Sequence, residues 1–323
     1  MNRSPFRNRR PLVATAAAIA FLCGATLAFA WGMTGHKIAT KAAVSLVERR
    51  LRTFFSANLE SLVAFSNEPD VLSKVDSKEV PSHFLDLDLF GESPFVNIPA
   101  DEKAFVAQFG AEALEKGRLP WAVRDTYDAL VRAFEKRNYE EILRNAGHLS
   151  HYVADATMPL HATKNYKGQS SGNVIFEGDA PDRHVHVRFE IGMIDAYRDA
   201  VEKGMASRFG RVRRIANPAE EAMALLKLSY AYIDPILEAD KALLASGEKP
   251  TPSYYAGMYD RVGDIAERQL ALAATEVASF WTSAWEAGGK PKLPDARVVL
   301  VHPPLVEAPL PAPAPQAKVE GTK

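Results

Sequence analysis

The chain has 323 residues, of which 47% are hydrophobic and 24% charged, and its formal net charge is −1. This balance excludes the broad basic surface with which proteins bind duplex nucleic acid. The single cysteine, Cys23, lies within the first thirty residues. The rest of the chain therefore has no disulfide or thiol nucleophile, and its stability must come from a hydrophobic core, from metals or from both.

Residues 1–30 have the pattern of a secretory signal. A start with four arginines is followed by an apolar run from Leu12 to Leu22, which is too short to span a bilayer, and then by a small-x-small cleavage pattern that ends at Ala30. We expect a secreted or periplasmic protein that begins at Trp31. Without these four arginines it has 35 basic and 40 acidic residues, a formal charge of −5.

Helical periodicity dominates the remaining chain. It predicts helices over residues 36–55, 101–117, 120–137 and 138–156, over 217–244 with a kink at Pro235, and from Thr251 to near Gly288. Two long irregular loops, 66–100 and 157–182, lie between helices, and such loops are usually functional or mobile. No segment shows the alternation of apolar and polar residues that is typical of a strand. We predict one all-α domain over residues 31–289, followed by a disordered, proline- and alanine-rich tail over 290–323.

Five of the eight histidines lie within residues 148–186, with acidic residues close by. His151 and Asp155 are four residues apart, as are His186 and Glu190, and this spacing places each pair on one face of a helix. His161 follows six residues after Asp155. A lone pair of this kind is usually a surface ion pair, but two pairs and a third histidine on apolar helices favour a divalent ion, because a buried charge pair without one costs several kcal/mol.

The other histidines give weaker signals. His148, three residues before His151, is interpreted as a packing or outer-sphere residue, His184 as solvated, and His302 as a tail residue without a role. The acidic loop upstream adds Asp70 and His83, although acidic loops are usually only solvated.

The residue that cleavage would expose, Trp31, predicts a further ligand. A free terminal amine and the carbonyl of the same residue form a five-membered chelate ring around an ion, and His36 would complete the site. The amine binds metal only when it is deprotonated, which a terminus with a pKa of about 8 achieves more easily than lysine. Alternatively, Trp31 is simply the residue that follows the signal.

Taken together, four motifs resemble the superfamily of zinc-dependent phospholipase C and single-strand-specific P1-type nucleases. They are "WGMTGH", "HFLDLD", "HYVADATMPLH" and "HVRFE", and they span residues 31–190. The resemblance implies an all-helical domain with a metal cleft, three zinc ions and hydrolysis of phosphodiesters. By position, it implies a first zinc held by Asp70, His83, His151 and Asp155, a second held by His161, His186 and Glu190, and a third held by Trp31, His36 and the shared Asp155.

In the mechanism that this resemblance implies, a water activated by zinc attacks phosphorus, and Asp70 both binds metal and accepts a proton. Asp76 lies in the same loop and is the alternative to Asp70. Three zinc ions add six positive charges, so an acidic protein can act on phosphates.

The expected substrate is a phospholipid headgroup, because the His-x-x-x-Glu pair and "PLHATKNY" are closer to the lipase branch; the alternative is single-stranded nucleic acid. An interfacial lipase would expose an apolar rim for transient contact with a membrane surface, for which Phe90, Phe95 and Val96 are candidates. A nuclease would stack bases on Tyr166 or Phe176. A non-catalytic zinc-binding envelope protein is the third possibility.

Overall fold

The computed structural model describes residues 31–178, 182–245 and 249–306, and within these ranges it contains helices and no strand. The predicted all-α fold is therefore confirmed, whereas the predicted signal at residues 1–30 lies outside the described ranges. The longer helices are α1 (Gly32–Leu46), α2 (Arg49–Ala57), α3 (Leu59–Ser73), α4 (Glu102–Phe109), α5 (Leu119–Lys136), α6 (Tyr139–Asp155), α9 (Arg198–Ala206), α10 (Pro218–Tyr230), α11 (Ile233–Leu243) and α12 (Pro252–Ala287).

Short helical segments connect these helices, and several of them contain predicted ligands. They are the 3-10 turns η1 (Val80–His83), η2 (Leu87–Leu89), η3 (Ala111–Lys116) and η4 (Pro159–Ala162), the π-helical turn η5 (Arg188–Met193), and the short helices α7 (Val185–Val187) and α8 (Ile194–Ala196). No described helix is long and apolar enough to cross a membrane.

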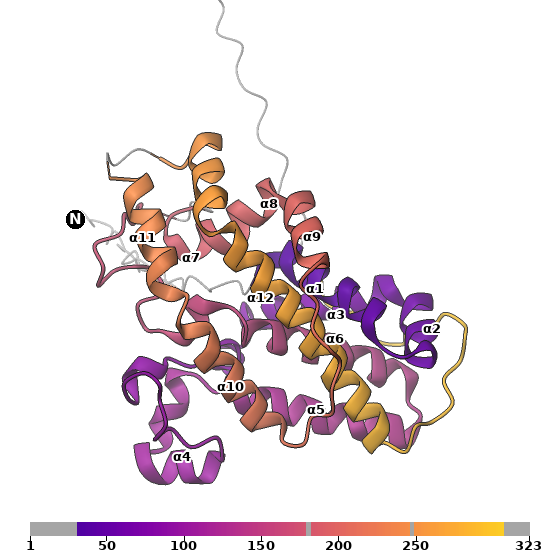
Figure 1. Cartoon of the computed structure of the whole chain (residues 1–323). Coiled ribbons are helices and arrows are strands. Elements are labelled where there is room, and N and C mark those ends of the chain that lie inside the picture. The colour runs from indigo at the N-terminus through magenta and orange to yellow at the C-terminus, as the bar shows by residue number, and fades with distance from the viewer. Residues whose placement is uncertain (1–30, 179–181, 246–248, 307–323) are drawn as a thin grey trace, which may run out of the picture.

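The core forms around α12, which crosses the molecule diagonally and packs on α1, α5, α6, α9 and α11 (Figure 1). Trp281 of α12 is fully buried, and its Nε1 donates a hydrogen bond to the Ala146 carbonyl at 2.9 Å. Helices α3 and α6 approach each other closely at Gly147, where a Cβ would lie 2.4 Å from the Cβ of Phe65. This contact keeps the C-terminal halves of α3 and α6 together, and both carry candidate ligands.

Helix starts follow the capping residues in the sequence. The side chains of Asn138, Asn217 and Thr251 accept hydrogen bonds from backbone N–H groups three residues further on, and proline follows directly after the last two. These caps satisfy N–H groups that have no partner inside the helix, so they fix the first residues of α6, α10 and α12.

Four predicted element boundaries are wrong. The helix over 101–117 ends at Phe109, because Gly110 adopts a positive φ, and the chain continues as the 3-10 turn η3. The helix over 36–55 is interrupted at Val47, because Glu48 caps a new helix by accepting from the N–H of Arg50. The loop 66–100 begins inside α3, which continues through Pro69 to Ser73. The bend near Pro235 comes instead between α10 and α11, and Pro235 lies in the first turn of α11, where a missing N–H leaves no helical bond unmade.

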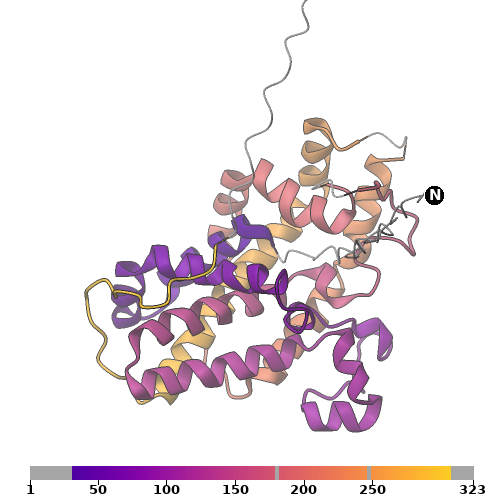
Figure 2. The same cartoon turned by 180° about the vertical axis from the view of Figure 1, so that it is seen from behind.

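The predicted disorder of the tail is wrong for residues 290–306. This segment, yellow in Figure 2, runs back past the first helices. Side chains of the helical body hold its backbone: Asn58 accepts from the N–H of Val298 at 2.7 Å, Glu140 from those of Val301 and His302, and Glu68 from that of Leu305. A proline-rich segment can stay extended when such partners bind its N–H groups. The rest of the predicted tail lies outside the described residues.

Candidate metal centre

The predicted ligands come from six elements and meet in the interior. His36 lies on α1, Asp70 near the end of α3, and His83 at the end of η1, while α6, η4 and the α7–η5 segment supply the others. Each of these residues is at most 3% exposed. They form three groups whose ligand atoms lie within 4.8 Å of one another: His36, His151 and Asp155; Asp70, His83 and His151; and His161, His186 and Glu190.

The group around His83 has the spacing of a first coordination shell. His83 Nδ1 lies 3.0 Å from His151 Nε2 and 3.2 Å from Asp155 Oδ2, and Asp70 Oδ1 is 3.8 Å from both ring nitrogens. Ligand atoms around a tetrahedral zinc ion are about 3.3 Å apart, since each lies about 2 Å from the ion. The four residues implied for the first zinc therefore surround a volume that suits one ion.

The group formed by His161, His186 and Glu190 likewise combines imidazole rings with a carboxylate. His186 Nε2 lies 2.9 Å from Glu190 Oε2, and His161 Nε2 lies 3.8 Å from the same oxygen. Between the two members of the pair, the fully buried Arg188 makes a bidentate contact with Asp240 at 2.7 Å. This contact ties the π-helical turn to α11 and so fixes the direction of His186 and Glu190.

The third group lies next to the first. His36 Nε2 is 3.5 Å from Asp155 Oδ1, and its ring stacks on that of His151 with centroids 3.9 Å apart. Trp31 is fully buried: its ring Nε1 donates to the Ala154 carbonyl at 2.9 Å, and its backbone N–H lies close enough to Glu190 to lower the pKa of that carboxylate against the larger, raising effect of burial. The backbone of Trp31 thus reaches the cluster, while its coordination of a metal stays a prediction.

Burial shifts the ionisable groups toward their uncharged forms. It lowers the pKa values of His83 and His186 to about 3 and holds the pKa of His151 and His161 well below the usual value. Burial, and then the charges of neighbouring carboxylates, raises the pKa of Asp155 well above its usual range. Neutral imidazole is the form that binds metal, and crowded buried carboxylates are stabilised by a cation.

Hydrogen bonds to the backbone orient two of the histidines for metal binding. The Nδ1 of His151 donates to the Ser66 carbonyl at 2.8 Å, and the Nδ1 of His161 donates to the His83 carbonyl at 2.6 Å. Each ring therefore presents an unprotonated Nε2 to its group. The buried Nε2 of His161 makes no hydrogen bond within the described residues. Donor type, tautomer and spacing all fit zinc.

Asp70 and Asp76, the two alternatives that the sequence left for one ligand, lie in different positions. Asp70 is buried beside His83 and His151, whereas Asp76 is exposed and its carboxylate accepts from the N–H of Lys78. The structure brings Asp70 to the cluster and leaves Asp76 outside it.

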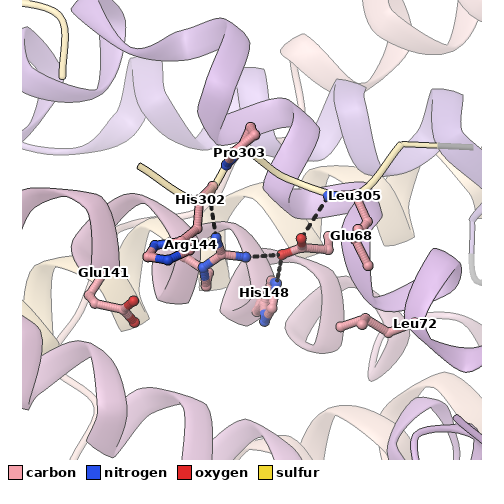
Figure 3. A pocket seen from close by; sticks show the side chains of 8 residues that line it. All are labelled: Glu68, Leu72, Glu141, Arg144, His148, His302, Pro303 and Leu305. Carbon is pink, nitrogen blue, oxygen red and sulfur yellow. Dashed lines mark hydrogen bonds and ion pairs between the residues drawn. The ribbon is translucent and has the colours of Figure 1, made fainter. Parts of the chain in front are cut away.

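The remaining histidines differ from one another. His148 binds Glu68 at 2.7 Å and belongs to none of the three groups. His184, predicted to be solvated, is only 2% exposed, because it directly precedes α7 and its ring packs against those of His186 and Tyr166. His302 lines a pocket with Glu68 and His148 (Figure 3).

The residues proposed for substrate contact differ in their exposure and in their distance from the cluster. Phe95 is 2% exposed and packs edge-on against Tyr230, so it belongs to the core and not to an apolar rim, whereas Val96 is 77% exposed. Phe90 packs on the phenylalanines of α4. Tyr166 lies beside the cluster, with its ring centroid 5.5 Å from that of His186.

The sequence interpretation missed two residues at the cluster, Glu79 and Tyr152. Glu79 Oε1 lies 3.5 Å from His83 Nε2 and accepts a hydrogen bond from the hydroxyl of Tyr152. The available signal was the spacing of Glu79 and His83, which are four residues apart like the other two pairs.

Comparisons with known proteins give distant likenesses. No family model matches the chain. A probable serine protease of Bradyrhizobium tropiciagri is 23% identical over 364 aligned positions, which cover 86% of this chain and 46% of that protein. The chain thus spans about half the length of this relative, and identity at this level assigns no activity.

Among solved structures, the alpha-toxin of Clostridium absonum is 16% identical with a TM-score of 0.45, over 77% of this chain and 63% of the toxin. The alpha-toxin of an avian strain of Clostridium perfringens is 15% identical with a TM-score of 0.46, over 80% and 64%. The chain spans less than two thirds of either toxin.

Proposed function

We propose that the protein is a secreted zinc-dependent phosphodiesterase of the phospholipase C type, with three zinc ions per chain. The observation that carries the proposal is the position of Asp155. Its Oδ1 faces His36 at 3.5 Å, and its Oδ2 faces His83 and His151 at 3.2 and 3.4 Å. One carboxylate therefore serves two adjacent groups, an arrangement typical of hydrolytic metal clusters and not of a closed structural zinc site.

The residues have distinct roles in this proposal. Zinc at the three groups supplies an activated water and charge stabilisation on phosphoryl oxygens. Asp70 contributes only one side of the first group, at 3.8 Å from each imidazole, so it is the ligand with most freedom to accept a proton. Burial of the surrounding side chains excludes bulk water, which strengthens every electrostatic contact there.

Two observations favour different substrates. The carboxylate of the second group is Glu190, as in the phospholipase branch that the sequence resembles. The ring of Tyr166 beside His186, with the ammonium of Lys167 5.1 Å from its centroid, instead favours a nucleic acid, because bases stack on aromatic rings and an ammonium attracts phosphate. The P1-type nuclease therefore remains the second candidate.

Phosphorus NMR separates these candidates. We would incubate the zinc-loaded protein beginning at Trp31 with phosphatidylcholine and single-stranded RNA together, beside an Asp70→Asn variant. Phosphocholine formed by the parent and not by the variant supports the proposal. Nucleoside monophosphates would support the nuclease. Neither product from a protein that holds zinc would support the non-catalytic zinc-binding protein and reject both enzymes.

A further inference from the structure

The ring of His83 is engaged on two sides. Its Nδ1 faces the first metal group, 3.0 Å from His151 Nε2 and 3.2 Å from Asp155 Oδ2. Its Nε2 points the other way and makes no hydrogen bond within the described residues, and the acidic atom that faces it is Glu79 Oε1 at 3.5 Å. His83 therefore differs from His151 and His161, whose outer nitrogens meet backbone carbonyls.

Glu79 is itself held in place. It directly precedes η1, one helical turn before His83, and its side chain is 20% exposed. The hydroxyl of Tyr152, on α6, donates a hydrogen bond to its Oε1. The ring of Tyr152 also packs edge-on against His83 and His151, with centroids 5.8 and 5.5 Å apart. Two side chains from different elements thus define the plane of the His83 ring and the position of the carboxylate behind it.

We propose that Glu79, held by Tyr152, is the positioning residue for His83 in the first metal group. Its carboxylate keeps the ring proton of His83 on Nε2 and so leaves the lone pair of Nδ1 for the ion. This inference rests on the proposed zinc cluster. A carboxylate behind a metal-bound histidine also increases the basicity of the ring, and loss of such a partner typically weakens metal binding 10–100-fold.

Cadmium binding followed by cadmium-113 NMR tests this role without relying on activity. The full chain from Trp31 is compared with Glu79→Ala, Glu79→Gln and Tyr152→Phe, and Glu115→Gln serves as the control because Glu115 is exposed on η3. We expect three resonances in the parent and in Glu115→Gln. In both Glu79 variants one resonance should shift while two stay fixed, and chelator competition should show one zinc bound 10–100-fold more weakly. Tyr152→Phe should shift the same resonance.

The possible failures are distinguishable. A parent that binds no metal would refute the proposed zinc cluster, on which the role of Glu79 rests. Three parent resonances that stay unchanged in Glu79→Gln, with unchanged zinc affinity, would overturn the positioning role and leave the cluster intact. If Glu79→Ala does not fold, Glu79→Gln and Tyr152→Phe decide the question, since both keep the shape of the side chain. Equal movement of all three resonances would indicate general loosening of the fold and would also overturn the proposal.

Discussion

Asp86 offers a test of the electrostatics around the cluster that needs no substrate. It lies between η1 and η2, and burial followed by the charge of Asp88 raises its pKa from 3.8 to about 7, against the opposing effect of Lys116 and Lys164. Asp88 accepts hydrogen bonds from the hydroxyl of Thr163 and the N–H of Lys164. These bonds hold the carboxylate of Asp88 in place near Asp86.

The sign follows from the direction of the shift. Between about pH 4 and pH 7 the folded protein holds a proton on Asp86 that the unfolded chain has lost, so stability falls as the pH rises through this window. The difference between 3.8 and about 7 corresponds to about 4 kcal/mol, and we take about half of it because the two lysines and solvent reorganise around a charge near the surface. An Asp86→Asn protein has no such charge to accommodate, so we expect it to match the parent near pH 4 and to exceed it by about 2 kcal/mol at pH 8.

Urea unfolding of metal-free protein at the two pH values measures this difference. Asp88→Asn tests the second cause of the shift: it weakens two hydrogen bonds and so destabilises the fold at pH 4, but less at pH 8, because it also removes a charge that raises the pKa of Asp86. An Asp86→Asn protein whose stability relative to the parent is the same at pH 4 and pH 8 would refute the reasoning. The zinc content of this variant should equal that of the parent, since Asp86 belongs to none of the three groups.

Other perturbations address the ligands and the C-terminal segment. His161→Ala should remove about one zinc per chain, measured by atomic absorption; unchanged metal content would contradict the assignment of the second group. One extra residue ahead of Trp31 should displace the terminal chelate and sharply lower activity, and full activity in such a protein would rule out the terminal ligand. A chain that ends at Ala296 loses the backbone hydrogen bonds to Glu68 and Glu140, so its free energy of unfolding should fall by about 2–4 kcal/mol, visible as a lower thermal midpoint; an unchanged midpoint would show that these bonds contribute nothing.

Local patterns in the sequence predicted the parts of the site that depend on helical spacing. The four-residue separation of His151 and Asp155 places both on one face of α6, and Asn138 fixes where that helix begins. His186 and Glu190 keep the same relation although the turn between them is π-helical. Such pairs need only a continuous helix, so sequence reasoning reached them.

The misplaced features depend on contacts between distant segments. Helix α3 passes through Pro69 to bring Asp70 to the cluster, and its packing on α6 depends on the glycine at position 147. Residues 290–306 are ordered because Glu68 and Glu140, far away in sequence, accept from their N–H groups. Around Glu68 the arrangement is visible directly: its carboxylate binds Arg144, His148 and the N–H of Leu305 at once (Figure 3). Composition contains no information on such partners.

The three groups of ligands are connected to one another. Asp155 links the third group to the first, and the His83 carbonyl links the first to the second, because it accepts from His161 Nδ1. The backbone N–H of Trp31 lowers the pKa of Glu190, so the segment that precedes His36 also lies next to the second group. A substitution at the shared Asp155 should therefore weaken the binding of two ions, whereas a substitution at an unshared ligand such as His161 should weaken mainly that of its own ion. The affinities of all three ions, measured in one variant, therefore distinguish a shared ligand from an unshared one.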